Sequence, residues 1–482
     1  MVDNNEQSLA GIPSSVNRRR FLARTGLIGA SVLAGCAGTR PSTGDGASSS
    51  APSASVAVTS VPQTQVAAHP VPGSTLAPHV ADVQQTAPPV HVSQEAVQNW
   101  ETVREQFTLT RDFIHMSSFY LASHPTSVRD AIDAHRRGLD ENPIGYHVAN
   151  NSRCERAVRE VAAEYLGVHA DEIALTDSTT MGLGLLYAGL KLRQDQEILT
   201  TAHDHYATSA SLQLRAEKTG AAIRSIPLYQ NLATVSKAEI VETLVKEIRP
   251  QTRVVAITWV HSSTGLKLPV REIADALAQL NIDRAPAERA LLCVDGVHGL
   301  GVEDIQLAEL GCDFFVAGCH KWLFGPRGTG FVWGRREAWS EVTATIPSFS
   351  GNATFGPAMT PGGFHSFEHR WALAEAFHFH LAIGKSRIAE RIHELNRQLK
   401  EGLVKLPHVK LHTPVADNLS AGIVCFEMDG LSPYDVVERL RERKIIASVT
   451  PYATKYARLA PSLVTMPEDV EQTLSEVSNL NG

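Results

Sequence analysis

Helical and strand-like hydrophobic patterns alternate along the middle of the chain. Apolar residues recur at helical spacing over residues 154–166, and a short apolar run at 173–176 follows at once. The alternation continues, and it predicts helices at 181–192, 207–219, 237–248 and 270–280 and further strands at 197–201, 221–227, 253–260, 290–294, 314–317 and 330–333. This order predicts an α/β fold in which helices cover both faces of a mostly parallel sheet.

The pattern changes after residue 350. A bridge that contains Gly and Pro leads into a long helical stretch at 372–406, and strands mixed with two further helices follow. We therefore expect a major domain at 94–350, which also holds an N-terminal segment of the smaller domain, and a smaller α+β domain at 351–482. Because ligands of mostly parallel sheets bind at the carboxyl ends of the strands, the site is expected at that edge of the major domain.

Residues 1–36 are typical of an export signal. Three arginines at 18–20 precede an apolar, Gly- and Ala-rich run at 25–35 that is too short to span a bilayer easily. This pattern predicts export by the twin-arginine route, and residues 33–36 resemble a lipobox in which Cys36 is acylated. The alternatives are a signal that is cleaved without lipidation and a basic tail beside a chance apolar run.

Composition limits the partners of the chain. Residues 37–93 are rich in Ser, Ala and Pro with almost no charge, which predicts a disordered tether between a lipid anchor and a periplasmic catalytic body. A net charge of -7 and the lack of a basic stripe argue against nucleic acid. The six cysteines show neither a C-x-x-C pair nor a zinc spacing, so no metal is expected. The five beyond Cys36 are predicted to be buried thiols.

Two polar segments each follow a predicted strand. The segment at 177–180 carries an Asp, a Ser and two Thr between a strand and a helix, where hydroxyls and free helix amides can bind a phosphate. Plain N-capping by Asp177 or Ser178 is the alternative. His205 follows the strand at 197–201, where an imidazole can stack on a flat heteroaromatic ring or serve only as a hydrogen-bonding loop residue.

A carboxylate and a lysine follow two further apolar strands. Asp295 comes directly after the strand at 290–294, where a buried charge needs a positive partner such as a pyridinium nitrogen; a helix cap is the alternative. Lys321 follows the run at 314–317, where burial lowers the pKa and makes the free amine a nucleophile; a lysine that reaches water from the strand end is the alternative. Because a hydroxyl loop, a His, an Asp and a Lys each end a strand of one sheet, a shared site is favoured.

On these residues the chain resembles the class V aminotransferase family of fold type I pyridoxal-phosphate enzymes, in particular its isopenicillin N epimerase-like branch, over residues 107–480. The resemblance implies a fold type I major domain with a seven-stranded sheet, pyridoxal phosphate as the cofactor and a homodimer. It implies these cofactor contacts: Thr179 and Thr180 on the phosphate, His205 stacked on the ring, Asp295 on the pyridine nitrogen, His298 near the ring hydroxyl, His320, and Lys321 joined to the cofactor aldehyde as an imine. Arg458 falls on the arginine that binds a substrate carboxylate.

The chain departs from the family at two places. Residues 261–265 read His-Ser-Ser-Thr-Gly where many members have an Asn, so the resemblance leaves the contacts to the ring hydroxyl open. Residues 448–453 lack the mobile cysteine that the cysteine desulfurase branch requires, so sulfur mobilisation is not expected.

The chain is therefore predicted to be an enzyme that acts on the amino group or α-carbon of a small amino compound. In this hypothesis Lys321 moves protons at the α-carbon, while Asp295 keeps the cofactor ring protonated as an electron sink. Aminotransferase-like chemistry ranks first, and epimerase or β-lyase chemistry is the alternative. The alternative of a different class is a surface-anchored ligand-binding protein without catalysis.

Overall fold

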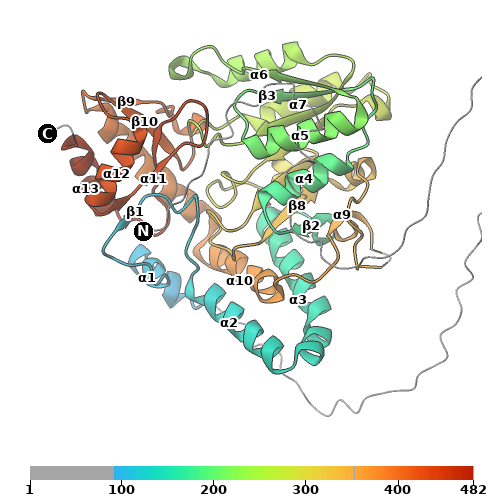
Figure 1. Ribbon diagram of the computed structural model, residues 1–482, viewed down its shortest axis with the longest axis horizontal. Coiled ribbons are helices and arrows are strands. Elements are labelled where there is room, and N and C mark those ends of the chain that lie inside the picture. The colour runs from blue at the N-terminus through green and yellow to red at the C-terminus, as the bar shows by residue number, and fades with distance from the viewer. Residues whose placement is uncertain (1–91, 352, 481–482) are drawn as a thin grey trace, which may run out of the picture. The chain divides into compact units, whose positions relative to one another are not determined.

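A seven-stranded sheet lies at the centre of the computed structural model, which describes residues 92–351 and 353–480 (Figure 1). The order across the sheet is β2-β8-β7-β6-β5-β3-β4. Only β8 runs antiparallel to its neighbours, which confirms the mostly parallel sheet. The strands, each within two residues of its predicted bounds, are β2 (Ile173–Thr176), β3 (Glu197–Thr201), β4 (Ala222–Ile226), β5 (Thr252–Thr258), β6 (Leu291–Asp295), β7 (Phe314–Gly318) and β8 (Gly330–Gly334).

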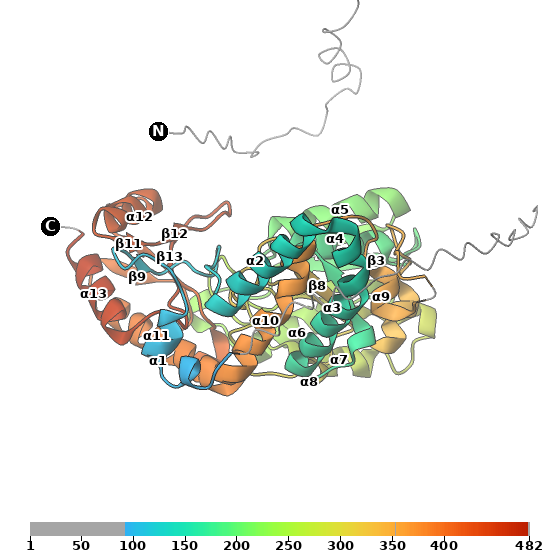
Figure 2. The ribbon, with the colours of Figure 1, turned by 90° about the horizontal axis from the view of Figure 1, so that it is seen from below.

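Helices cover both faces of this sheet because successive side chains of a strand point to opposite faces. Leu199 and Val255 belong to one buried cluster, whereas their neighbours Ile198 and Val254 belong to another on the opposite face. Each cluster includes side chains of the helices on its own face. These helices are α4 (Thr179–Gly189) and α5 (Tyr206–Thr219) on one face, and α6 (Lys237–Glu247) and α7 (Val270–Leu280) on the other (Figure 2).

A second, smaller α+β unit is built around a four-stranded antiparallel sheet of order β12-β13-β10-β9. Its strands and helices are β9 (Val409–Leu411), β10 (Val424–Met428), β12 (Ser448–Val449), β13 (Ala457–Leu459), α11 (Lys385–Val404), α12 (Pro433–Glu442) and α13 (Pro467–Ser478). The short β1 (Ile114–His115) pairs in parallel with β11 (Ile445–Ile446). A segment that precedes the large sheet in the sequence therefore contributes to this unit, and Ile114 and Met116 lie in its core.

The long helical stretch predicted at 372–406 is helical in the structure but is interrupted once. The structure has two helices there, α10 (Phe367–Ile383) and α11, which are separated at Gly384. Gly384 has a φ of 97°, a conformation that a right-handed helix does not allow, so the chain turns at this residue. We also did not predict α2 (Thr126–Glu141), which packs with α10 beside the large sheet (Figure 1).

Several predictions concern what the chain contains beyond its main fold. The export signal, Cys36 and the tether as far as residue 91 lie outside the described residues. Within residues 92–351 and 353–480, no helix is both long and apolar enough to cross a membrane, and no three metal-binding side chains form a group. The cysteines in this part of the chain are free and buried, as predicted: Cys154, Cys293, Cys312, Cys319 and Cys425.

Candidate active site

The predicted site residues follow the carboxyl ends of four strands that run in the same direction in the large sheet. The turn after β2 leads into Thr179, and the turn after β3 contains His205. Asp295 ends β6, and Lys321 follows β7, which pairs directly with β6. The charge of Lys321 acts on the pKa of each of the residues Asp295, His205, His298 and His320, so the structure brings these groups together.

Lys321 is the centre of this arrangement, and its amine contacts an imidazole. Its Nζ lies 3.2 Å from Nε2 of His298. The other ring nitrogen, Nδ1, accepts a hydrogen bond from the indole Nε1 of Trp322 at 3.3 Å. Because an indole N–H can only donate, the neutral His298 ring must carry its single proton on Nε2 and donate it to the lysine. This geometry requires a lone pair on the Lys321 nitrogen, so it favours the unprotonated amine.

The electrostatic surroundings act in the same direction. Burial and the charge of Arg458 together lower the pKa of Lys321 to about 8, although Asp295 opposes both effects. Burial holds the pKa of His298 well below its ordinary value, which keeps the ring neutral and suited to its contact with the amine. Lys321 is therefore a partly buried nucleophile whose free amine is available near neutral pH.

Asp295 is a buried carboxyl group that forms no ion pair with the described residues. It is 3% exposed and accepts a hydrogen bond from the Val297 amide at 3.2 Å. Burial raises its pKa to about 6, although the Val297 amide and the charge of Lys321 both favour its ionised form. A cationic ring nitrogen beside this carboxyl group would stabilise its ionised form.

His205 is held by the turn that follows β3. Its Nδ1 accepts a hydrogen bond from the Ala207 amide at 3.3 Å, which caps α5. The preceding Asp204 fixes the turn, because its carboxylate accepts the amides of Thr201 and Thr258, both at 2.8 Å. Burial, together with the charges of Lys321 and Arg458, lowers the pKa of His205 to about 4. The ring is therefore neutral at physiological pH, as stacking on a flat heteroaromatic ring requires.

The turn at 177–180 is a helix N-terminus with a tight approach to β7. Ser178 caps α4 by accepting the Met181 amide at 3.1 Å, so the capping alternative is correct for this residue. The hydroxyl of Thr179 accepts the Gly318 amide at 2.8 Å. A Cβ at Gly318 would lie 2.9 Å from that hydroxyl oxygen and 3.2 Å from Cε1 of His320. Glycine thus leaves a small cradle between the two segments, and Thr180 lies exposed beside it.

Asp177, which the sequence offered as the other possible cap, has a different role. Its carboxylate accepts a hydrogen bond from the guanidinium of Arg370 at 2.9 Å. Arg370 is 5% exposed and comes from α10, far along the chain. The pair holds the turn at 177–180 against α10. The Asp177 carboxylate is therefore directed to Arg370 and not to the first amides of α4.

Arg458 reaches the site from β13 in the smaller unit. Its guanidinium donates to the carbonyl oxygens of Ser262 at 3.1 Å and Val449 at 2.9 Å. It also lies over the ring of Phe119, 4.8 Å from the centroid. The group is 4% exposed, and its position is fixed from three separate segments. A fixed guanidinium with remaining N–H groups can bind a carboxylate with two parallel hydrogen bonds.

Three residues at the site were missed by the reasoning from sequence. Trp322 orients His298, Phe119 supports Arg458, and Tyr452 bonds to Ser262 with 2.7 Å between the two hydroxyl oxygens. Tyr452 lies in the segment at 448–453. From the sequence, this segment mattered only for its missing cysteine, and its tyrosine side chain had no predicted role. No local sequence pattern marks Phe119 as a site residue, because only the fold brings it to Arg458.

Known proteins resemble this chain along most of its length. The family model for aminotransferase class-V matches residues 124–454. Isopenicillin N epimerase of Streptomyces clavuligerus is 25% identical over 407 residues, covering 80% of this chain and 100% of that protein. A probable cysteine desulfurase of Xylella fastidiosa (strain Temecula1) is 27% identical over 367 residues, covering 71% of this chain and 83% of that protein.

Solved structures agree on the fold. A C-DES mutant with glycine covalently linked to its PLP cofactor superposes with a TM-score of 0.71 at 23% identity, covering 78% of this chain and 99% of the other. This likeness confirms the predicted fold type I architecture, and the family match confirms the resemblance from which the cofactor was predicted. The chain belongs to the aminotransferase class-V family of pyridoxal-phosphate-dependent enzymes.

Proposed function

We propose that this chain abstracts the α-proton of an amino acid substrate and that Lys321 is the base. The observation that carries the proposal is the bond from Trp322 to His298, which leaves Nε2 of His298 as a donor to the Lys321 amine. An amine that accepts a hydrogen bond is unprotonated and can take a proton. The Lys321 nitrogen is therefore the atom that can take the α-proton of a bound substrate.

The residues present fit pyridoxal phosphate. The cradle at Gly318, with the N-terminus of α4, Thr179, Thr180 and His320 around it, suits a phosphate group. Neutral His205 suits the face of the pyridine ring, and buried Asp295 suits its protonated nitrogen. When bound, the cofactor supplies an electron-withdrawing ring that stabilises negative charge at the substrate α-carbon.

The other groups of the chain bind the substrate and hold its protons. Arg458 binds the substrate carboxylate, because its guanidinium is already fixed by Ser262 and Val449. The burial of Asp295 and Arg458 excludes water, which strengthens each of these electrostatic contacts. Lys321 then takes the proton from the carbon next to the bound carboxylate.

Transamination, epimerisation and β-elimination all share this first step. A persulfide-forming route that uses a cysteine of the chain is disfavoured, because each cysteine among the described residues is buried. The segment at 448–453 offers Tyr452 where the desulfurase branch needs its cysteine. Aminotransferase-like chemistry and epimerase chemistry are thus the two reaction types to separate.

The test is a panel of amino acids incubated with the purified enzyme in deuterated water. We expect a yellow protein whose absorbance band is abolished by borohydride, and exchange of the substrate α-proton for deuterium. Formation of an oxo acid identifies transamination, and interconversion of enantiomers identifies epimerisation. A colourless protein that does not bind pyridoxal phosphate would contradict the proposal and favour the ligand-binding alternative.

We also propose that the chain forms a homodimer, as the family resemblance implies. Apolar side chains that are 75–86% exposed gather near α3 (Pro143–Leu166) and the segment at 349–364: Ile144, Val148, Phe349 and Phe364. His147, which lies on the same helix, packs on Phe364 with 6.0 Å between ring centroids. Clustered, strongly exposed apolar side chains are typical of a surface that another protein chain covers. Light scattering should give a dimer for the wild type and a monomer for Phe364→Asp, whereas Ile282→Asp, at another exposed apolar residue, should remain dimeric.

Finally, we propose twin-arginine export and lipid anchoring, supported by the arginines at 18–20 and by Cys36. Fractionation of cells should place the wild type in the membrane fraction, exposed to the periplasm. Arg19→Lys should retain the protein in the cytoplasm, and Cys36→Ser should release it as a periplasmic protein. A Cys36→Ser protein that stays in the membrane fraction would contradict the lipid anchor.

A further inference from the structure

The hydroxyl group of Tyr452 lies at the active site and is not used by the proposed function. It is 2.7 Å from the hydroxyl oxygen of Ser262, which follows β5. The Tyr452 ring meets the ring of His205 edge-on, with centroids 6.1 Å apart and planes at 83°. The charges of Asp295 and Arg458 both act on this phenol. A polar group of the smaller unit therefore sits among the cofactor-binding and substrate-binding residues.

The loop that carries Tyr452 is held in one conformation by its own hydrogen bonds. The Thr450 amide donates to the carbonyl of Tyr456 at 2.9 Å, and the Thr450 hydroxyl accepts the Tyr456 amide at 2.9 Å. That hydroxyl also donates to the Thr454 carbonyl at 3.2 Å. The ammonium of Lys455 donates to the carbonyl of Tyr452 itself at 3.1 Å. The phenol is thus placed by a fixed hairpin loop between β12 and β13.

Ser262 links this phenol to the substrate-binding arginine. The carbonyl oxygen of Ser262 accepts from Arg458, and the hydroxyl of the same residue contacts Tyr452. The α-carbon of an amino acid is bonded to the carboxylate that Arg458 binds. The phenol is therefore linked, through the single residue Ser262, to the guanidinium that binds the carboxylate beside the reacting carbon. Lys321 approaches that carbon from the turn after β7, where His298 holds its amine.

Tyr452 and Lys321 differ in their protonation state at neutral pH. Burial raises the pKa of Tyr452 above its ordinary value, so the phenol keeps its proton at neutral pH. Burial lowers the pKa of Lys321 to about 8, so a useful fraction of its amine is free of a proton. The site thus holds one proton donor and one proton acceptor that come from different domains.

We propose that Tyr452 is a second catalytic acid–base group at the substrate α-carbon, and that the chain is an amino-acid epimerase. The inference rests on the proposed function of Lys321. Lys321 takes the α-proton from one face, and the electron pair of that C–H bond stays on the carbon. Tyr452 gives its Oη proton to the other face, where a new C–H bond forms. Lys321 is then an ammonium and Tyr452 a phenolate, and proton exchange with water restores both. In the reverse direction the two groups exchange roles.

The test compares the wild type with Tyr452→Phe on both enantiomers of each amino acid in deuterated water. The wild type should exchange the α-proton of both enantiomers and interconvert them. Tyr452→Phe should interconvert them about 100-fold more slowly, yet still exchange the proton of the single enantiomer that Lys321 faces. Titration of the cofactor absorbance should show that the variant binds the substrate about as tightly as the wild type. Tyr434→Phe, at a tyrosine 58% exposed on α12, should match the wild type.

Other results would overturn the proposal in distinguishable ways. Equal loss of exchange for both enantiomers, with weaker substrate binding, would make Tyr452 a positioning residue only. Unchanged interconversion by Tyr452→Phe, or a wild type that acts on one enantiomer and releases an oxo acid, would remove its acid–base role and leave Lys321 as the base. A wild type that binds no cofactor and exchanges no proton would overturn the proposed function together with this inference.

Discussion

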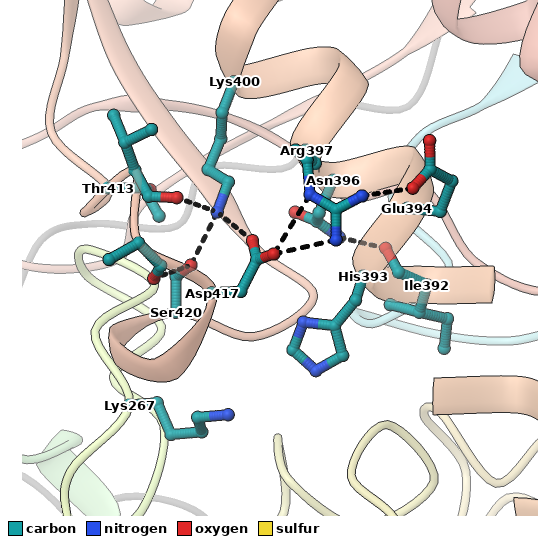
Figure 3. A network of polar contacts seen from close by, with 12 residues as sticks. Lys267, Ile392, His393, Glu394, Asn396, Arg397, Lys400, Thr413, Asp417 and Ser420 are labelled. Carbon is teal, nitrogen blue, oxygen red and sulfur yellow. Dashed lines mark hydrogen bonds and ion pairs between the residues drawn. The ribbon is translucent and has the colours of Figure 1, made fainter. Parts of the chain in front are cut away.

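Two lysines of this chain, Lys400 fully buried and Lys321 partly buried, have opposite surroundings. Lys400, in α11, has a side chain that is 1% exposed, and its ammonium group meets three acceptors. It donates to the carbonyl of Val415 at 2.8 Å, to the hydroxyl of Ser420 at 2.7 Å and to the carboxylate of Asp417 at 3.3 Å (Figure 3). Lys321, at the end of β7, has an imidazole N–H of His298 as its hydrogen-bond partner.

The difference shows what makes a buried lysine reactive. An ammonium group carries three donors, and at Lys400 each has an acceptor, one of them charged. Burial lowers the pKa of Lys400 although Asp417 acts against this effect, and the three acceptors suit an ammonium group that ties α11 to the segment at 413–420. At Lys321 the partner is itself a donor, so the neutral amine is favoured. Burial alone does not create a nucleophile, and the hydrogen-bonding character of the partners decides.

The strongest way to break the comparison is to remove each lysine in turn, beginning with Lys321→Ala. We expect turnover to fall by about 10³-fold or more, because the base and the covalent link to the cofactor are lost together. The free energy of unfolding should change little, because the lost amine was not holding a carboxylate. Single-turnover kinetics and denaturant titration measure the two quantities. Retained activity would show that another group is the base.

Lys400→Met should have the opposite effect, a loss of stability without a loss of turnover. The methionine keeps much of the side-chain volume but leaves the Val415 carbonyl and the Ser420 hydroxyl without their donor. Asp417 still pairs with Arg397 at 2.9 Å, which limits the loss. We expect the free energy of unfolding to drop by about 2–3 kcal/mol, with normal turnover per folded molecule. If Lys400→Met lost as much turnover per folded molecule as Lys321→Ala, Lys400 would also serve the active site.

Reasoning from sequence found one of these lysines and not the other, for a physical reason. Lys321 closely follows an apolar strand, and the edge where parallel strands end is fixed by local pattern, so its position at that edge could be predicted. Lys400 lies among polar residues of a helical pattern, like any exposed lysine. Its burial depends on a segment more than ten residues away that folds back over it, and no local pattern reports that contact.

The same reason separates the other features of the fold and the site into those that could be predicted from the sequence and those that could not. The strand bounds and the positions of Asp295 and His205 could be predicted because they depend on the order of elements along the chain. Tyr452 and Phe119 could not be predicted, because they reach Ser262 and Arg458 from other segments of the chain. The break at Gly384 was missed because a single glycine in a helical pattern does not reveal its φ angle.

A pH titration sharpens the contrast between the two amines. With the pKa of Lys321 lowered to about 8, the neutral fraction of its amine is half at that pH and falls about tenfold per unit below it. The rate at which cofactor-free enzyme binds pyridoxal phosphate covalently should therefore rise about tenfold per unit up to about pH 8 and then level off. An ordinary lysine would continue to gain rate toward pH 10.5. Stopped-flow absorbance between pH 6.5 and 9.5 distinguishes the two curves.

The smallest expected effect tests why the Lys321 amine is neutral. Trp322→Phe removes the indole N–H, so Nδ1 of His298 can take the ring proton, and Nε2 becomes an acceptor that favours the lysine ammonium. The pKa seen in cofactor binding should rise by about one unit, and the rate at pH 7 should fall several-fold while the rate at pH 9.5 changes little. Trp339→Phe is the matched control, because the Trp339 indole donates to the Glu172 carbonyl at 3.2 Å and does not contact His298. An unchanged pH profile in Trp322→Phe would show that the tautomer of His298 does not set the protonation state of Lys321, and burial would then be the sufficient cause.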